Sequence, residues 1–566
     1  MLIAETALKG LTGWDLSVVV VYMIAIVGIG CGATWWHKRK AHLHTLGEEQ
    51  GGYFLAGGTL TWPLIGLALF STNISTVHLV SLAEKGYTSG LVVGNTEWMA
   101  GLCLMILAVF FAPFFLKAKV ATLPDFLEKR YSRASRNWLA GVSIFSAVFI
   151  HIGFTLYAAA IVLHGLFGLD INTCIVAVAI ATGLYTIIGG LLAVVLTETI
   201  QTVVLLVGAT CLTIFAYDKV GGWEGITQNV DSTQLSMLRE TGPGDGGMPW
   251  YAALLGYPVI GIWYWCTDQT IVQRVLGAKS ENHGRVGPLF AGFIKILPVF
   301  IFILPGVMCM AMVKQGVLPE LDDPKNTYAF MIEHLLPVGM RGLMAAALLA
   351  AAMSTVSGAL NSIATLFTYD LYKQFKPNAP EKTLVRVGRI TTAVAMALAI
   401  VWSIFGIGGG QALFDQFATI ICLIAPPITV TFLLGVFWKR ASSRGSIITM
   451  LVGTAMGAVM FGIYKVHWAA QAAADGKEYW SFCKDCLPPL LQNFWMASFY
   501  LAILCAIIHM VTSVIWPDEP SELKMSLVWD HPLDALRGDA WRGIGNYKFL
   551  SIALLLTIIG FYIAFA

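Results

Sequence analysis

Long runs of apolar residues, separated by short polar segments, make up most of the chain. A helix of about 20 consecutive apolar residues spans a bilayer. By this measure the sequence predicts an all-α integral membrane protein with about fourteen transmembrane helices. The predicted spans are roughly residues 14–36, 54–83, 88–115, 137–166, 171–190, 192–217, 248–275, 286–313, 338–369, 387–408, 411–438, 445–465, 491–515 and 547–565.

The composition supports a membrane protein. Of the 566 residues 57% are hydrophobic and only 12% are charged, whereas a soluble domain carries about 25% charged residues. The longest polar stretches, near 218–247, 466–490 and 516–546, leave no room for a soluble domain, so we expect one transporter domain over 1–566. No basic stripe suggests nucleic acid as a partner. The first span has no small-residue cleavage site behind it, so we expect it to be retained as a helix.

Basic residues are distributed unevenly between the two sets of loops. One alternating set (37–53, 116–136, 274–285, 370–389, 439–444 and 516–548) contains 24 of the 35 Lys and Arg residues. Basic loops face the cytoplasm, so an even number of spans places both termini outside the cell membrane. The polar loop with Cys483 and Cys486 would also lie outside, and whether these two form a disulfide is left open.

Two predicted spans contain residues that interrupt a membrane helix. The first is Pro63–His78, with Pro, Gly and six polar side chains, and the second is Gly256–Gln269. Backbone polar groups in lipid must be satisfied, so irregular backbone is tolerated where it lines a cavity. Paired broken helices in the two halves of a transporter indicate the substrate site. The alternative is a simple kink, since Pro and Gly are common in membrane helices.

Several ionisable residues fall inside spans, where each charge costs about 2.5–3.5 kcal/mol on insertion scales. Interface positions or structural ion pairs are the alternative, which we favour for Asp268 because Arg274 is near. Lys295, with apolar neighbours, fits a functional role better. The ionisable residues inside predicted spans are Glu97, Glu198, Asp268, Lys295, His78 and His151.

A small-residue helix, 345–352, leads into Ser354, Thr355 and Ser357. Small residues permit close helix packing. Adjacent hydroxyls facing a broken helix would also offer the neutral oxygen ligands that hard cations such as sodium prefer.

Four stretches together resemble the sodium/solute symporter family, and within it the sodium/glucose cotransporters. The resemblance runs over nearly the whole chain. It implies a LeuT-type core of two inverted five-helix repeats, with broken first and sixth core helices and alternating access to a midplane site. The four stretches are Trp263–Arg274, Asn361–Asp370, Tyr53–Gly57 and Gly189–Gln201.

The resemblance also assigns residues. It implies a ten-helix core at about 54–438, a first peripheral helix in 1–53 and C-terminal peripheral helices in 439–566. It implies sodium ligands at the carbonyls of Ser71, Ile74 and Ala351 and the hydroxyls of Ser354 and Thr355. The implied solute-binding residues are Asn73, His78, Glu97, Tyr264, Trp265 and Lys295.

Three positions depart from the family pattern. The sugar-binding Gln of the tenth core helix falls at Ala418, and a polar position on the third core helix is His151. Both leave the identity of the solute open. Glu198 stands where the family has an Asp tied to sodium coupling, which leaves the number of sodium ions open. We assign it to a possible second sodium site or exit path.

These observations predict a sodium-coupled symporter, with sodium as the co-transported ion, that imports a monosaccharide such as glucose or galactose. The alternatives are another solute (myo-inositol, an amino sugar, a carboxylate or an amino acid) or a non-transporting sensor or channel on the same fold. No Ser/His/Asp set, metal-ligand cluster or phosphate loop suggests an enzyme.

The loop charges generate a topological prediction. In a cysteine-free background, a membrane-impermeant thiol reagent applied to intact cells should label a cysteine at Lys477 and spare one at Arg39. The reverse labelling pattern would overturn the orientation.

Overall fold

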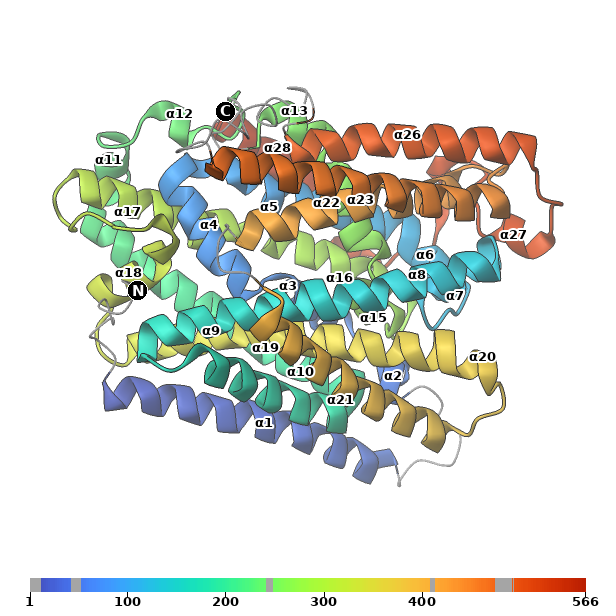
Figure 1. The fold of residues 1–566 in the computed structure, drawn as a ribbon, viewed down its shortest axis with the longest axis horizontal. Coiled ribbons are helices and arrows are strands. Elements are labelled where there is room, and N and C mark those ends of the chain that lie inside the picture. The colour runs from blue at the N-terminus through green and yellow to red at the C-terminus, as the bar shows by residue number, and fades with distance from the viewer. Residues whose placement is uncertain (1–11, 42–51, 241–247, 408–412, 474–490, 492) are drawn as a thin grey trace.

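The computed structural model describes residues 12–41, 52–240, 248–407, 413–473, 491 and 493–566. In these segments the fold is all-helical, and the one β feature is an isolated bridge between Leu60 and Ala278. Most long helices run nearly parallel to one another, along the longest axis of the molecule (Figure 1). Position 477, for which labelling from outside is predicted, lies outside the described residues, as do Cys483 and Cys486.

Eleven stretches of helix in the described residues are long and apolar enough to cross a membrane. They are Gly13–Gly32, Thr76–Lys117, Arg133–Leu166, Ile171–Val220, Glu281–Lys314, Met340–Phe375, Glu381–Phe405, Ala418–Phe437, Ser443–Val466, Phe494–Ile515 and Tyr547–Ala564. The chain is therefore a multi-pass, all-helical membrane protein.

The difference from the fourteen expected spans has a structural cause. The spans expected at 171–190 and 192–217 form one 50-residue element, α10 (Ile171–Val220), with a kink at Gly190. Gly190 has φ +64°, and an added Cβ would lie 2.4 Å from the carbonyl oxygen of Tyr53. A glycine is needed there for both reasons.

The two spans expected to be interrupted are interrupted in the structure. The first consists of α2 (Gly52–Leu55), α3 (Trp62–Asn73) and α4 (Thr76–Ser89), with α4 continuing toward the next span. The second consists of α13 (Trp250–Leu255), α14 (Tyr257–Ile262), the π-helical turn η5 (Trp263–Thr267) and α15 (Gln269–Leu276). Neither forms one continuous apolar helix.

Four of the other spans in the described residues also contain a short π-helical turn, a feature that occurs often at functional sites. The segments of the other spans are α1 (Gly13–Ala41), α5 (Asn95–Ile106), η3 (Leu107–Phe111), α6 (Ala112–Lys117), α8 (Arg133–Phe145), η4 (Ser146–Ile152), α9 (Gly153–Phe167), α16 (Glu281–Ile294), η6 (Val299–Ile303), α17 (Leu304–Lys314), α19 (Met340–Leu366), η8 (Phe367–Tyr372), α20 (Lys373–Phe375), α21 (Glu381–Phe405), α22 (Leu413–Phe437), α23 (Ser443–Ala473), α26 (Phe494–Ile515) and α28 (Tyr547–Ala564).

Shorter helices lie in the connections. They are η1 (Ala56–Gly58), η2 (Gly90–Gly94), α7 (Leu123–Arg130), α11 (Gly222–Thr227), α12 (Ser232–Leu235), η7 (Pro324–Asn326), α18 (Thr327–Leu335), α27 (Glu522–Ser526), η10 (Pro532–Arg537) and η11 (Gly543–Gly545).

The interrupted helices lie at the centre of the packing. α3 packs against α10, α15, α16 and α19, and α14 packs against α5, α22 and α26. The helix α1 lies along one side of the bundle, against α10 and α19 (Figure 1). At its start, the buried Asp15 accepts hydrogen bonds from the backbone N–H groups of Gly339 (2.8 Å) and Gly342 (2.9 Å). A carboxylate there satisfies the open N-terminus of α19 and fixes α1 to the bundle.

Candidate solute and sodium sites

The break in the first interrupted helix positions two of the predicted solute ligands. Asn73 ends α3, and Ile74 and Ser75 then adopt extended backbone conformations before α4 begins. The Ser75 hydroxyl and the Nδ1 atom of His78 lie 2.9 Å apart, and the two residues form a capping box. Because such a box satisfies backbone donors at a helix start, it also fixes the direction of the His78 ring.

A buried ion pair joins the next two predicted residues. The ammonium group of Lys295, at the C-terminal end of α16, pairs with the Glu97 carboxylate in the first turn of α5. The same Nζ atom donates to Oδ1 of Asn73 at 2.7 Å and lies 5.7 Å from the centroid of the Trp265 ring. Side-chain exposure is 1% for Lys295 and 4% for Glu97, so each charge depends on the other for compensation.

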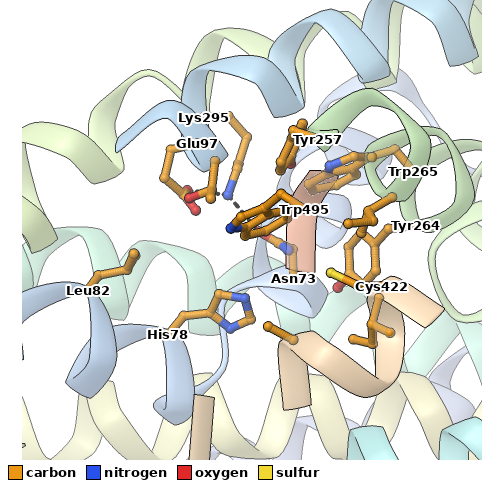
Figure 2. A pocket seen from close by; sticks show the side chains of 15 residues that line it. Asn73, His78, Leu82, Glu97, Tyr257, Tyr264, Trp265, Lys295, Cys422 and Trp495 are labelled. Atoms are coloured by element: carbon orange, nitrogen blue, oxygen red, sulfur yellow. Dashed lines mark hydrogen bonds and ion pairs between the residues drawn. The ribbon is translucent and has the colours of Figure 1, made fainter. Parts of the chain in front are cut away.

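All six predicted solute-binding residues line one cavity. Figure 2 shows Lys295, Glu97 and Asn73 meeting at one side of it and Tyr264 and Trp265 at another. Together with the space at its mouth, the cavity measures about 690 Å³, within the range of small-molecule sites. Its lining comprises Asn73, His78, Leu82, Thr96, Glu97, Tyr257, Ile260, Gly261, Tyr264, Trp265, Lys295, Ala418, Ile421, Cys422 and Trp495.

Sequence reasoning missed part of this lining. Tyr257 could have been predicted from the sequence, because it lies in the second interrupted span. Trp495 could not have been predicted in this way, because it belongs to α26, a helix that the resemblance places outside the transport core. Ala418 does line the cavity and offers no polar group there.

The third-helix position His151 packs against Tyr264. The two rings are stacked, with centroids 6.2 Å apart and an interplanar angle of 11°. The Nε2 atom of His151 lies 3.5 Å from Oδ2 of Asp268, and Asp268 Oδ1 accepts from the backbone N–H of Thr270 at 2.6 Å. Asp268 therefore caps α15 at the break and faces His151.

Asp268 has a structural role, as the alternative favoured for it expects, but Arg274 is not its partner. The Arg274 guanidinium forms its ion pair with Glu198, on α10, and its Nε donates to Glu198 Oε2 at 3.3 Å. Thr72 also donates to this carboxylate, at 3.0 Å. Asp268 is used as the N-cap of α15, whereas Arg274 lies nearly two turns further along the same helix and reaches α10. In this conformation both carboxylate oxygens of Glu198 are engaged.

The hydroxyls of Ser354 and Thr355 reach the first helix break. Ser354 donates to the carbonyls of Ser71 (2.8 Å) and Ala351 (3.1 Å). Thr355 donates to the carbonyls of Thr72 (3.0 Å) and Ala351 (3.2 Å). The structure thus brings four of the five predicted sodium ligands together, and Ile74 is at the break itself, three residues after Ser71. These neutral oxygens are the ligand type that a hard cation prefers.

The helix geometry explains why these oxygens meet. Ser354 and Thr355 follow Ala345–Ala352, so α19 can approach α3 closely. Both hydroxyls also donate back to a carbonyl in the preceding turn of their own helix, as Ser and Thr commonly do in buried helices. A cation would accept lone pairs from the same hydroxyl and carbonyl oxygens that now bond to one another.

A glycine makes room for the neighbouring ion pair. A Cβ atom at Gly358 would lie 2.5 Å from Nη2 of Arg274 and 3.2 Å from Oε1 of Glu198. The Arg274–Glu198 pair therefore occupies space on α19 one turn beyond Ser354. The candidate sodium ligands and this pair are adjacent, and they are linked through Thr72.

Comparison with known proteins identifies the protein family. Residues 53–453 match the sequence profile of the Sodium:solute symporter family. The chain belongs to this family. It is therefore a sodium-coupled solute symporter and not an enzyme.

Related proteins carry sugars or polyols in their names. The chain is similar to the sodium/mannose cotransporter of Bos taurus, with 32% identity over 100% of this chain and 98% of the relative. It is similar to sodium/glucose cotransporter 1 of Oryctolagus cuniculus, at 33% identity over 78% of this chain and 71% of the relative. It is similar to sodium/myo-inositol cotransporter 2 of Homo sapiens, with 31% identity over 92% of this chain and 79% of the relative.

Solved structures show the fold. The chain superposes on the substrate-bound, outward-open state of a Na⁺-coupled sialic acid symporter with a TM-score of 0.72 and 23% identity, covering 90% of this chain and 99% of that one. It superposes on the transporter Mhp1 with a TM-score of 0.53 and 16% identity, covering 87% and 99%. The chain thus shares the LeuT-type fold of these two transporters.

The buried Glu97–Lys295 pair generates a prediction for stability. Glu97→Gln and Lys295→Met should each lower the free energy of unfolding by about 3–5 kcal/mol, because one buried charge loses its partner. The double variant should be more stable than either single variant. Thermal unfolding of purified protein in detergent measures this, with Arg537→Gln, an exposed basic residue, as the control. Additive losses in the double variant would show that the two charges are not coupled.

Proposed function

We propose that the chain imports a neutral sugar, most simply a pyranose monosaccharide such as glucose or galactose, together with sodium. The observation that carries this proposal is the composition of the cavity. A carboxylate, an ammonium and an amide meet at one side, and aromatic rings lie at the other. A sugar hydroxyl both donates and accepts, so one polyol satisfies all three polar groups while its C–H faces contact the rings.

The charge balance of the cavity favours a neutral solute. Glu97 and Lys295 already compensate each other, so a carboxylate solute would bring an additional buried charge without a partner. A zwitterionic amino acid would bring two further charges, and Glu97 and Lys295 are already engaged with each other. A sugar can bind to the outer lone pair of Glu97 and the outer N–H of Lys295 while the pair stays intact. The names of the related glucose, mannose and myo-inositol cotransporters agree with a polyol solute.

Sodium is the co-transported ion in this proposal, held by the carbonyls of Ser71, Ile74 and Ala351 and the hydroxyls of Ser354 and Thr355. An ion there would tie α19 to the end of α3. Asn73 is two residues after Ser71, so the ion would also fix the backbone that presents Asn73 and His78 to the solute. Occupancy of the ion site then raises solute affinity, and by linkage the solute raises sodium affinity equally.

Release to the cytoplasm would require α15 to move. The inner half of the second broken helix is held by Gln269, whose Oε1 accepts from the Leu123 N–H at 2.8 Å, and by Gln273, whose Nε2 donates to the Phe54 carbonyl at 2.9 Å. The Arg274–Glu198 pair adds a third tie. We propose that these ties close the inner path in this conformation and break during alternating access. Glu198 would then be exposed to an ion that leaves the site. Its role in an exit path or a second sodium site stays a prediction.

The proposed topology has fourteen transmembrane segments, with 54–438 as a core of two inverted repeats, 1–53 and 439–566 as peripheral helices, and both termini outside. Fourteen segments result if the kinked α10 is counted as two crossings and the two interrupted helices are added to the other ten of the eleven spans. In Figure 1 the start of α1 and the C mark lie toward the same end of the bundle, which supports an even number of crossings.

Sodium-driven uptake tests this function. Purified protein in proteoliposomes, with an inward sodium gradient, should accumulate at least one of radiolabelled D-glucose, D-galactose, D-mannose and myo-inositol, and potassium should not replace sodium. Ser354→Ala with Thr355→Ala should raise the sodium concentration for half-maximal uptake about tenfold or more, because two oxygen ligands are lost. Ser526→Ala, distant on α27, serves as the control. Uptake that is equal with and without sodium, or confined to charged solutes, would refute the proposal.

A further inference from the structure

Trp495 reaches the solute cavity from a helix outside the proposed transport core. It lies in the first turn of α26, and its side chain lines the cavity with Asn73, Glu97 and Lys295. Figure 2 shows its indole ring extending into the cavity, with the ring nitrogen on the side where Glu97 and His78 lie. The following argument rests on the proposed function and identifies how the solute is recognised.

Three contacts fix the position of Trp495, two through its backbone and one through its ring. The side chain of Asn493 caps α26 and accepts from the backbone N–H of Trp495 at 3.0 Å. An added Cβ at Gly256 would lie 2.5 Å from the Trp495 carbonyl oxygen, so α26 begins directly against the junction of α13 and α14. The Trp495 ring packs on the Tyr257 ring, with centroids 5.9 Å apart. The indole therefore has a defined orientation relative to the second broken helix.

The polar atom of this ring has no protein partner in the described residues. Trp495 is 9% exposed, and no described residue accepts a hydrogen bond from its Nε1. This nitrogen is not among the fully buried atoms without a partner, so it is open to the cavity. A buried indole N–H usually has an acceptor. Because this one lines the cavity, a bound solute is the natural acceptor.

The described side chains of α22, at 418–437, bring no amide group to the cavity. α22 contributes Ala418, Ile421 and Cys422, which share one helical face and carry no strong hydrogen-bonding group. Among the α22 residues whose side chains the structure describes, 418–437, none gives a sugar in this cavity an amide contact. Trp495 supplies both an N–H donor and an aromatic face to the same space.

We propose that Trp495 is a specificity-determining residue of the solute site. Its indole stacks on one C–H face of a pyranose and donates its Nε1–H to a ring substituent, in place of the amide that position 418 lacks. Tyr264 and Trp265 supply a second aromatic surface. Aromatic surfaces on two sides favour a pyranose whose hydroxyls are all equatorial, since such a ring has axial C–H groups on both faces. An axial hydroxyl would be pressed against an aromatic ring and would lower affinity.

Uptake kinetics of two Trp495 variants test the proposal. Trp495→Leu removes the aromatic face and the donor, and it should raise KM for D-glucose about tenfold or more and reduce discrimination against D-mannose and D-galactose. Trp495→Phe keeps a face and should recover part of the affinity. Maximum rate and sodium dependence should change little. Trp516→Leu, at the other end of the same helix, should match wild type. Wild-type KM and solute ranking in Trp495→Leu would overturn the proposal.

A second measurement separates this proposal from the proposed function. If wild-type protein accumulates none of the sugars, the proposed function fails, and thiol labelling then decides the placement of Trp495. Trp495→Cys in a cysteine-free background should react with a membrane-impermeant reagent from outside in sodium. A matched Val514→Cys variant, near the other end of α26, should not react. Absence of labelling at position 495 would show that the residue does not line a cavity open to the outside.

Discussion

The ion pair between Glu97 and Lys295 is the interaction on which the proposed site depends. It brings α5 and α16 together, and through Asn73 it holds the end of α3 at the same point. Two buried charges are tolerated only while they compensate each other and their remaining donors and acceptors are used. The pair therefore creates a cavity that is polar but carries no net charge. A solute that satisfies this site needs donors and acceptors in close proximity and no charge of its own.

The helix break next to the pair links the solute to the ion. Ser71, with its carbonyl bonded to Ser354, and Asn73, bonded to Lys295, are separated by one residue. Any rearrangement of the Ser71 carbonyl on binding a cation is transmitted to Asn73 through two peptide units. Thr72, between them, contacts both Thr355 and Glu198. One short segment thus connects the solute cavity, the candidate sodium ligands and the buried Arg274–Glu198 pair, which is the physical basis for coupling in this account.

Sequence reasoning succeeded where a polar residue stands out in an apolar span. The sequence alone shows that Glu97, Lys295 and Asn73 lie in apolar spans, where burying them is costly. Pro, Gly and polar residues mark the two interrupted helices. It failed where the answer depends on which distant helices meet. Two carboxylates were available to Arg274, and only the direction of α15 after its cap determines that Glu198 receives it. Trp495 looked like an ordinary residue of a peripheral helix, because nothing in its local sequence encodes the contact with Gly256.

Calorimetry of sugar binding to the purified protein, in sodium and in potassium, tests the central claim most directly. The account predicts that a neutral pyranose binds in sodium and that potassium weakens binding at least about tenfold, equivalent to about 1.4 kcal/mol of coupling free energy. Equal affinity in the two salts, or binding of a charged solute with no neutral sugar bound, would contradict it.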